Sequence, residues 1–189
     1  MSASALDTFI QHAMQVNASC PDPADCVQAL APQMQTLLRE AEQFLQPEHF
    51  HSNAQHYARN LVYEAPDKSL SLYTLVWLPG QWTPVHDHGS WGVVGVVEGV
   101  LEERSFVRLN PAREADTGIE LVRGGVILLS PGSVTSFVPN PDHIHITGVP
   151  ADEPRALSLH LYGRTMNSFN IYNVAAGTRQ RVDLAHNET

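Results

Sequence analysis

Cysteine is scarce in this chain of 189 residues, which contains only Cys20 and Cys26. Two cysteines are too few for the dense disulfide framework of a small secreted domain. Their spacing is not C-x-x-C, so it indicates neither a redox motif nor a metal site. A reduced pair is typical of a cytosolic protein, but the intervening loop also permits a disulfide. The sequence leaves that choice open.

Basic residues and long apolar runs are also lacking. Lysine and arginine total 11 against 20 acidic residues, which gives a net charge of −9 and no basic stripe, so nucleic acid is not an expected partner. No apolar run approaches the ~20 residues of a membrane span, and the first residues lack a cationic signal region. We therefore expect no membrane partner and a cytoplasmic location. The sequence does not determine the oligomeric state.

The chain shows two hydrophobic patterns, a helical one in its first part and a strand-like one in the rest. Apolar residues recur at helical spacing in the first ~50 residues, from Leu6 to Met14 and again from Ala31 to Leu45, before Pro47. From Tyr63 onward, short β-branched runs alternate with Gly and Pro, which predicts strands. These runs cover residues 70–78, 92–97, 101–109, 125–129, 134–138, 144–149 and 156–162.

Many short strands with turn signals favour a closed barrel or a double-sheet jelly roll. We predict a mainly β fold, a jelly-roll barrel with N-terminal α-helices. A single domain is expected over residues 1–189, with a helical cap in residues 1–50 and a metal-binding barrel core in residues 57–163.

His86 and His88 form the most informative motif. They follow a strand-like run and are two residues apart, so on an extended backbone their imidazoles point to the same side. A third imidazole, from His145, is expected to join them, and His143 is the alternative two residues earlier. Three neutral nitrogen ligands with open positions suit a catalytic iron or zinc ion rather than a closed structural site.

The glycine spacing around these motifs resembles the two-part cupin signature. Five residues separate Gly80 from the His-x-His pair, and five separate Gly125 from Pro131-Gly132. The usual cupin glutamate ligand would fall four or five residues after His88, where this chain has Gly92 and Val93. A set of three histidines is therefore expected, without the carboxylate.

Four motifs in order resemble the thiol dioxygenase family, of which cysteine dioxygenase is the best-known member. They are Tyr57-Ala58-Arg59-Asn60-Leu61-Val62, the His-x-His pair, His145 and Ser158-Leu159-His160-Leu161-Tyr162. The resemblance runs roughly from Tyr57 to Gly163. It implies an Fe(II) cofactor held by His86, His88 and His145. It also implies that a small thiol carboxylate, L-cysteine above all, is oxidised by O2 to the sulfinic acid.

The resemblance also assigns roles around the metal. Tyr162 is expected as the phenol beside the iron, with His160 orienting it and Ser158 orienting His160. Arg59, supported by Tyr57, resembles the clamp for the substrate carboxylate, since a guanidinium matches a carboxylate with two donors. Residues i, i+2 and i+4 of a strand share a face, so Ser158, His160 and Tyr162 can line one wall.

Two positions place the chain within the family. Animal members carry a cysteine, crosslinked to the triad tyrosine, five residues past the second histidine; the residue here is Val93, so Tyr162 is expected to be a free phenol. The related 3-mercaptopropionate dioxygenases tend to have glutamine in place of Arg59. Both positions indicate a bacterial, arginine-type member that acts on cysteine.

Alternatives remain open at this point. Arg164, two residues beyond Tyr162, is a candidate second substrate-binding cation, which would suit mercaptosuccinate; 3-mercaptopropionate is the other substrate alternative. A zinc or manganese cupin isomerase or hydrolase, and a metal-free ligand-binding cupin, are alternatives of other classes. Glu103 is expected at a solvated strand end, and His49 at the surface.

Overall fold

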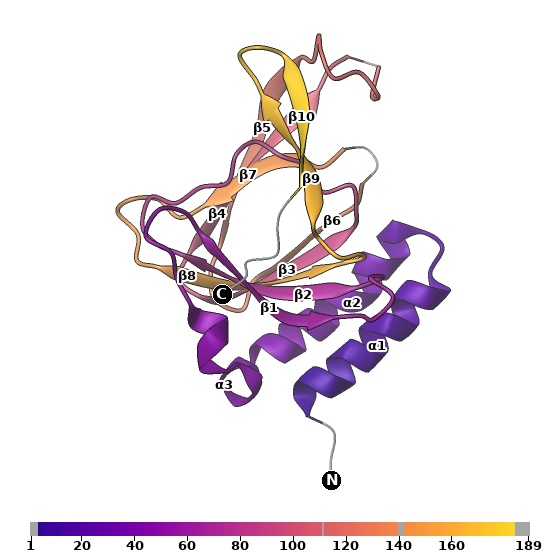
Figure 1. Cartoon of the computed structure of the whole chain (residues 1–189). Helices are drawn as coiled ribbons and strands as arrows, with labels where there is room; N and C mark the ends of the chain where they lie inside the picture. The colour runs from indigo at the N-terminus through magenta and orange to yellow at the C-terminus, as the bar shows by residue number, and fades with distance from the viewer. Residues whose placement is uncertain (1–3, 111, 140–141, 184–189) are drawn as a thin grey trace.

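Two antiparallel sheets form the body of the computed structural model, which describes residues 4–110, 112–139 and 142–183 (Figure 1). The larger sheet has the order β1-β2-β8-β3-β6 and the smaller has the order β5-β4-β7, with a separate β9-β10 hairpin. The larger sheet comprises β1 (Ala58–Glu64), β2 (Ser71–Trp77), β8 (Ala156–Tyr162), β3 (Gly92–Glu98) and β6 (Val134–Phe137). The others are β5 (Leu121–Leu129), β4 (Leu101–Arg108), β7 (Ile144–Gly148), β9 (Ser168–Asn173) and β10 (Thr178–Asp183). The predicted mainly β jelly-roll barrel is confirmed.

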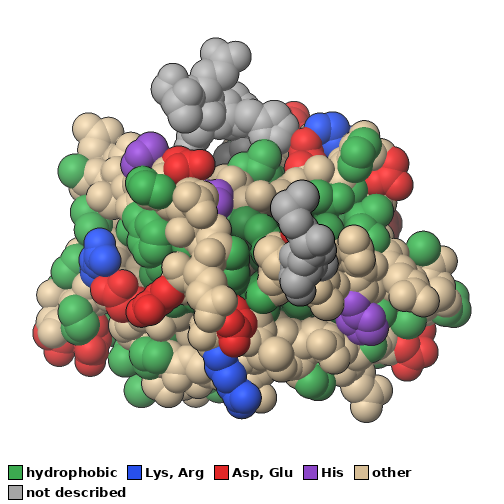
Figure 2. Space-filling model, turned by 90° about the horizontal axis from the view of Figure 1, so that it is seen from below, with side chains coloured by type: hydrophobic (Ala, Val, Ile, Leu, Met, Phe, Trp, Pro, Cys, Tyr) green, Lys and Arg blue, Asp and Glu red, His purple; other side chains and the backbone are tan. Residues whose placement is uncertain are grey.

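Helices cover the outer face of the five-stranded sheet. In Figure 1, α1 (Ala5–Ser19) and α2 (Pro23–Leu38) lie beneath this sheet, followed by the short α3 (Ala41–Phe44) and a 3₁₀ turn (Pro47–Phe50). None of the helices in the described residues is both long and apolar enough to cross a membrane. From the helix side, acidic groups are scattered over the surface among few basic ones (Figure 2).

The alternation of β8 explains why this sheet is buried on both faces. Leu157, Leu159 and Leu161 pack in the core shared with the helices. The intervening side chains therefore point to the barrel interior, because neighbours on a strand face opposite sides. All seven β8 residues are buried, and this strand presents its polar residues to the candidate site.

The first helices differ in part from the expectation. Ser4 caps α1, and its side chain and that of Asp7 form a capping box. The second helix begins at Pro23, not at Ala31, because Asp22 caps it and proline suits the first helical turn. Cys20 and Cys26 on either side of this cap are free thiols.

Strands β1, β9 and β10 were not predicted. Strand β10 is polar, and β1 is half-buried at the edge of its sheet with a bulge between Leu61 and Tyr63, so neither shows a clean apolar pattern. The expectation for His49 was also wrong. His49 is buried, and its carbonyl accepts a hydrogen bond of 2.6 Å from the Thr74 hydroxyl.

Candidate functional site

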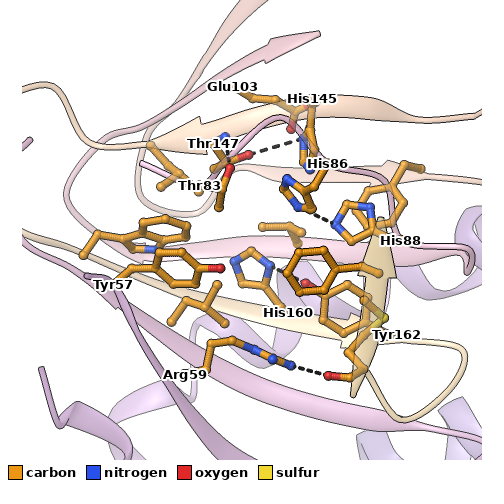
Figure 3. Close-up of a pocket in the computed structure, with 17 residues that line it drawn as sticks. Tyr57, Arg59, Thr83, His86, His88, Glu103, His145, Thr147, His160 and Tyr162 are labelled. Atoms are coloured by element: carbon orange, nitrogen blue, oxygen red, sulfur yellow. Dashed lines mark hydrogen bonds and ion pairs between the residues drawn. The ribbon is translucent and has the colours of Figure 1, made fainter. Parts of the chain in front are cut away.

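Three imidazoles meet where two distant segments pair. His86 and His88 lie between β2 and β3, and His145 lies on β7. The backbones of His86 and His145 exchange two hydrogen bonds of 3.0 Å, which fixes the segments side by side. All three side chains are buried, and one ring nitrogen from each lies within 4.8 Å of the others. Figure 3 shows them grouped on one side of the pocket.

The ring nitrogens are arranged as a metal site requires. His86 Nδ1 donates to the Pro84 carbonyl at 3.0 Å, so its Nε2 presents a lone pair, and it lies 3.2 Å from His88 Nε2. Two nitrogens about 2.1 Å from one ion at right angles lie about 3 Å apart. His145 Nε2 is buried and has no hydrogen-bond partner among the described residues. The three residues therefore fit a divalent metal ion.

Burial keeps these imidazoles neutral. It lowers the pKa of His86 and of His88 well below the usual value, and the pKa of His145 is lowered for the same reason. A neutral imidazole has the lone pair that a metal needs, whereas a protonated one would repel the ion. Three neutral ligands also leave the full charge of a divalent ion to act on an anionic substrate.

Glu103 was wrongly placed at a solvated strand end. Its side chain is buried and lines the pocket, with Oε1 3.4 Å from His145 Nδ1. Burial raises the pKa of Glu103, but its contacts with His143 and His145 outweigh this and hold the pKa below its usual range. A carboxylate on the outer nitrogen of a ligating histidine orients the ring. The sequence carried a signal for this, because Glu103 lies two residues after the buried Leu101 on the same strand face.

His143 stands beside the set of three rather than within it. Its Nε2 lies 3.3 Å from Glu103 Oε1, and its ring stacks on Phe137 with centroids 4.8 Å apart. Glu103, His143 and His145 also bring ligand atoms within 4.8 Å of one another. His145 is the residue that joins His86 and His88, as expected, and His143 is not.

A hydrogen-bonded chain runs along β8 into the pocket. Ser158 Oγ lies 2.8 Å from His160 Nε2, and His160 Nδ1 lies 3.2 Å from the Tyr162 hydroxyl. Trp77 Nε1 donates to Ser158 Oγ at 3.0 Å. The indole N–H of Trp77 can only donate, so Ser158 Oγ accepts from it, and the His160 ring links the Ser158 hydroxyl to the Tyr162 hydroxyl.

Burial sets the protonation of this chain. It lowers the pKa of His160 to about 3 and raises the pKa of Tyr162 above its usual value. Both groups are therefore neutral near pH 7, so His160 has one donor and one acceptor nitrogen with which to link the Ser158 and Tyr162 hydroxyls. The role of Trp77 as a donor becomes visible only in the structure, because it depends on the pairing of β2 with β8.

Arg59 and Tyr57 also line the pocket, opposite the imidazoles (Figure 3). Arg59 lies on β1, donates from Nη2 to the Met166 carbonyl at 2.8 Å, and rests over the Tyr73 ring at 4.5 Å. Tyr57 stacks on Trp77 with centroids 4.7 Å apart. These contacts with the backbone and with a ring hold the guanidinium group of Arg59 in place. Its remaining N–H donors are available to a ligand.

Arg164 does not line this pocket; it borders a separate groove with Asp87 and Arg181. Its Nη2 donates to the carbonyl of His88 at 2.8 Å and also contacts the carbonyl of Ser168. Arg164 thus holds the backbone of His88 instead of facing the site. The predicted β8 alternation ends at Tyr162, because the strand itself ends there.

The C-terminal hairpin of β9 and β10 anchors the His-x-His segment. The predicted core of residues 57–163 did not include this hairpin. Asp87 accepts hydrogen bonds from Tyr172 Oη at 2.6 Å and from Asn170 Nδ2 at 3.0 Å. Asp87 therefore points away from His86 and His88 and ties them to β9. Phe169 of the same strand lines the pocket.

Val93, the position at which animal members were expected to carry the crosslinked cysteine, does not lie opposite Tyr162. Val93 packs in the core on the helix side, whereas Gly92 is paired with Tyr162 across β3 and β8. A Cβ at Gly92 would lie 2.3 Å from Phe137, so the Phe137 ring fills the space beside this glycine. Neither Gly92 nor Val93 has a thiol, so no crosslink to Tyr162 forms from this strand.

Solved structures with a similar outline share little sequence. A protein from Thermus thermophilus is 18% identical, with a TM-score of 0.44 over 65% of this chain and 92% of that one. A double-stranded β-helix protein from Klebsiella pneumoniae is 15% identical, with a TM-score of 0.45 over 70% and 94%. A cupin-like protein from Thermotoga maritima is 15% identical, with a TM-score of 0.40 over 72% and 86%.

The match to a protein family is stronger evidence than these structural likenesses. Residues 3–175 match the family described as cysteine dioxygenase type I. This match covers the helices, the three imidazoles, the β8 chain and all of β9. The chain therefore belongs to the cysteine dioxygenase type I family.

Proposed function

We propose that this protein is an Fe(II)-dependent thiol dioxygenase that oxidises L-cysteine with O2 to the sulfinic acid. The family match carries the proposal, and the three neutral imidazoles of His86, His88 and His145 support it. Iron bound by these residues would supply the redox chemistry that O2 needs in order to react with a thiol sulfur. Both oxygen atoms enter the substrate, so no external reductant is required.

The chain's own residues would bind and orient the substrate. Arg59 would pair with the substrate carboxylate, because it is a fixed cation on the wall opposite the imidazoles. Tyr162 would donate its phenolic proton toward the reacting sulfur or oxygen, and the His160–Ser158–Trp77 chain holds that phenol in one orientation.

The proposal places the chain among the arginine-type bacterial members. Arg59 supports a substrate that carries a carboxylate, and the absence of a thiol at Gly92 and Val93 supports an uncrosslinked Tyr162. We leave Arg164 out of the substrate-binding set, since it is engaged with the backbone of His88. This removes the support that the sequence offered for mercaptosuccinate.

Oxygen uptake by the iron-loaded protein tests the proposal. A panel of L-cysteine, cysteamine, 3-mercaptopropionate and mercaptosuccinate would be assayed, with sulfinate measured by mass spectrometry. We expect the highest kcat/KM for L-cysteine and a large loss for cysteamine, which lacks the carboxylate. A preference for 3-mercaptopropionate would change the substrate but keep the class. No uptake with any thiol, in protein shown to contain iron, would reject the dioxygenase.

Metal analysis is the companion measurement. The His86→Ala variant is expected to lose stoichiometric iron while keeping its fold, because one of three ligands is removed. His12→Ala, far along the chain on α1, serves as the control. Unchanged iron in His86→Ala would refute the ligand assignment.

A further inference from the structure

A second groove lies beside the His-x-His segment and borders the candidate pocket at His88 and Phe169, which line both. Its lining also includes Arg164 from the loop after β8, Ser168 of β9 and Arg181 of β10. We call it the arginine groove. Its volume is about 270 Å³, which is room for several groups of the size of water.

Two guanidinium groups converge on one hydroxyl in this groove. Arg181 Nη2 donates to Ser168 Oγ at 2.8 Å, and Arg164 Nη1 donates to the same oxygen at 3.4 Å. Arg181 pairs with Asn170 across the hairpin, and Ser168 lies two residues before Asn170 on the same face of β9. The hairpin therefore holds two like charges close together, and they repel each other unless a negative charge joins them.

Arg164 is a partly buried cation without a carboxylate partner. The arginines of the described residues that are not exposed are Arg59, Arg108, Arg164 and Arg179. Arg108 and Arg179 each lie within 4.0 Å of an aspartate. Arg59 faces the candidate pocket, where the proposed substrate carboxylate would pair with it. Arg164 alone remains, because its hydrogen bonds within the described residues all go to hydroxyl and carbonyl oxygens.

Two carboxylates lie near the groove, and neither bonds to the converging Nη atoms. Asp87 lines the groove, but its oxygens accept hydrogen bonds from Tyr172 and Asn170. Asp183 lies 3.5 Å from Arg181 Nε, and both side chains are mostly exposed, at 82% and 70%. Water screens an exposed pair of this kind, so it offsets little of the positive charge in the groove.

The polar groups of the groove that have no protein partner are donors. Ser168 Oγ accepts from both arginines, and its own O–H has no acceptor in the described part of the chain. Arg181 Nη1 likewise has no acceptor in residues 4–110, 112–139 or 142–183. A guanidinium has donors only, and the Asp87 oxygens are already bonded. A ligand of this groove must therefore supply acceptors.

We propose that the arginine groove binds a small oxyanion of the sulfate or phosphate type, held by Arg164, Arg181 and Ser168. Such an ion has several acceptor oxygens, and its charge offsets the repulsion between the two guanidinium groups. The planar fork of arginine matches these oxygens with parallel N–H···O bonds.

The groove meets the metal-binding segment through Arg164. Arg164 Nη2 donates to the carbonyl of His88 at 2.8 Å, and Gly89 also lines the groove. The three residues that would hold the anion do not line the candidate pocket. The proposal therefore holds whatever reaction that pocket performs.

Titration calorimetry of the iron-loaded protein with sulfate under anaerobic conditions tests the site, with chloride added to keep the ionic strength constant. We expect saturable binding of one sulfate per chain. Arg181→Gln should raise the Kd for sulfate about tenfold, because it removes a charge-assisted contact at an exposed position. Arg155→Gln is the matched control, since Arg155 is also exposed and paired with an acid, Glu98; it should bind sulfate as the wild type does.

Arg59→Gln separates the groove from the candidate pocket, and it should keep the wild-type Kd for sulfate. Loss of binding in Arg59→Gln but not in Arg181→Gln would place the anion in the pocket and overturn the proposal. No saturable binding by the wild type, or an equal Kd in Arg181→Gln, would overturn it as well. Titration with inorganic phosphate supports the site if Arg181→Gln weakens that binding too, and the tighter of the two ions identifies the ligand type.

A crystal soaked in selenate, an analogue of sulfate, locates the ion by the anomalous scattering of selenium. We expect a peak beside Arg164, Ser168 and Arg181. Peaks at other positions alone would refute the assignment of the groove.

Discussion

Replacing Glu103 by glutamine should weaken metal binding without unfolding the protein. Glu103 Oε1 lies 3.4 Å from His145 Nδ1, and the side chain is buried. The carboxylate faces His145 Nδ1, which also lies 3.3 Å from Thr147 Oγ1, so it helps to orient the ring and makes its other nitrogen a better donor. Glutamine has the same shape and can still accept a hydrogen bond, but it lacks the charge.

The expected size follows from these contacts. Loss of a partner of this kind costs about 10–100-fold in metal affinity. Because the amide oxygen can keep the hydrogen bond, Glu103→Gln should fall near the lower limit, at about tenfold or about 1.4 kcal/mol. Glu103→Leu removes both charge and acceptor and should approach the upper limit of about 100-fold.

Anaerobic competition for Fe(II) with a chromophoric chelator measures this affinity directly. Glu102→Gln is a matched control, since Glu102 is the neighbouring acid on β4 and pairs with Arg104 on the other face. It should bind iron as the wild type does. Equal affinity in the wild type and in Glu103→Gln, or equal losses in the Glu102 and Glu103 variants, would refute the reasoning.

Three further predictions concern the supports of the site and the core. Trp77→Phe removes the donor to Ser158 and should lower the free energy of unfolding by about 1 kcal/mol. It should also lower kcat while the iron content stays unchanged. A wild-type kcat would show that Trp77 does not orient the β8 chain. Asp87→Asn removes the charged acceptor of Tyr172 and should lower the free energy of unfolding by about 1.5–3 kcal/mol in urea titrations; an unchanged midpoint would contradict the anchoring role. Leu30→Ala leaves a cavity at a fully buried position between α2 and the sheet and should lower the free energy of unfolding by about 2–5 kcal/mol. The protein that remains folded should keep its kcat. A loss of kcat in the folded protein would argue against this separation of core and site.

Local patterns were enough to predict the parts of the site that lie on one strand or one turn. The i, i+2 spacing set the imidazoles of His86 and His88 on one side, and the same rule aligned Ser158, His160 and Tyr162 on β8. A strand has a period of two, so such a prediction needs only the strand itself. The mainly β fold and the N-terminal helices likewise followed from periodicity and turn residues.

The family resemblance added what local patterns do not contain. It brought Arg59 into the same site as the three imidazoles, although these residues lie far apart in the sequence. His143 was the alternative to His145 two residues earlier, and the structure groups His145 with the other two imidazoles.

Tertiary structure alone decided which side chains support the site. Pairing between β4 and β7 brings Glu103 to His145, and pairing between β3 and β8 sets Gly92, not Val93, opposite Tyr162. The end of β8 turns Arg164 away toward the backbone of His88.

The sequence by itself therefore determined the fold class, the helical cap and the faces of individual strands, because these depend on neighbours a few residues apart. Register between strands, the buried position of Glu103 and the anchoring of Asp87 by β9 depend on segments up to 85 residues apart. Such contacts are set by the packing of the whole barrel, since a shift of one residue in register moves every side chain to the other face.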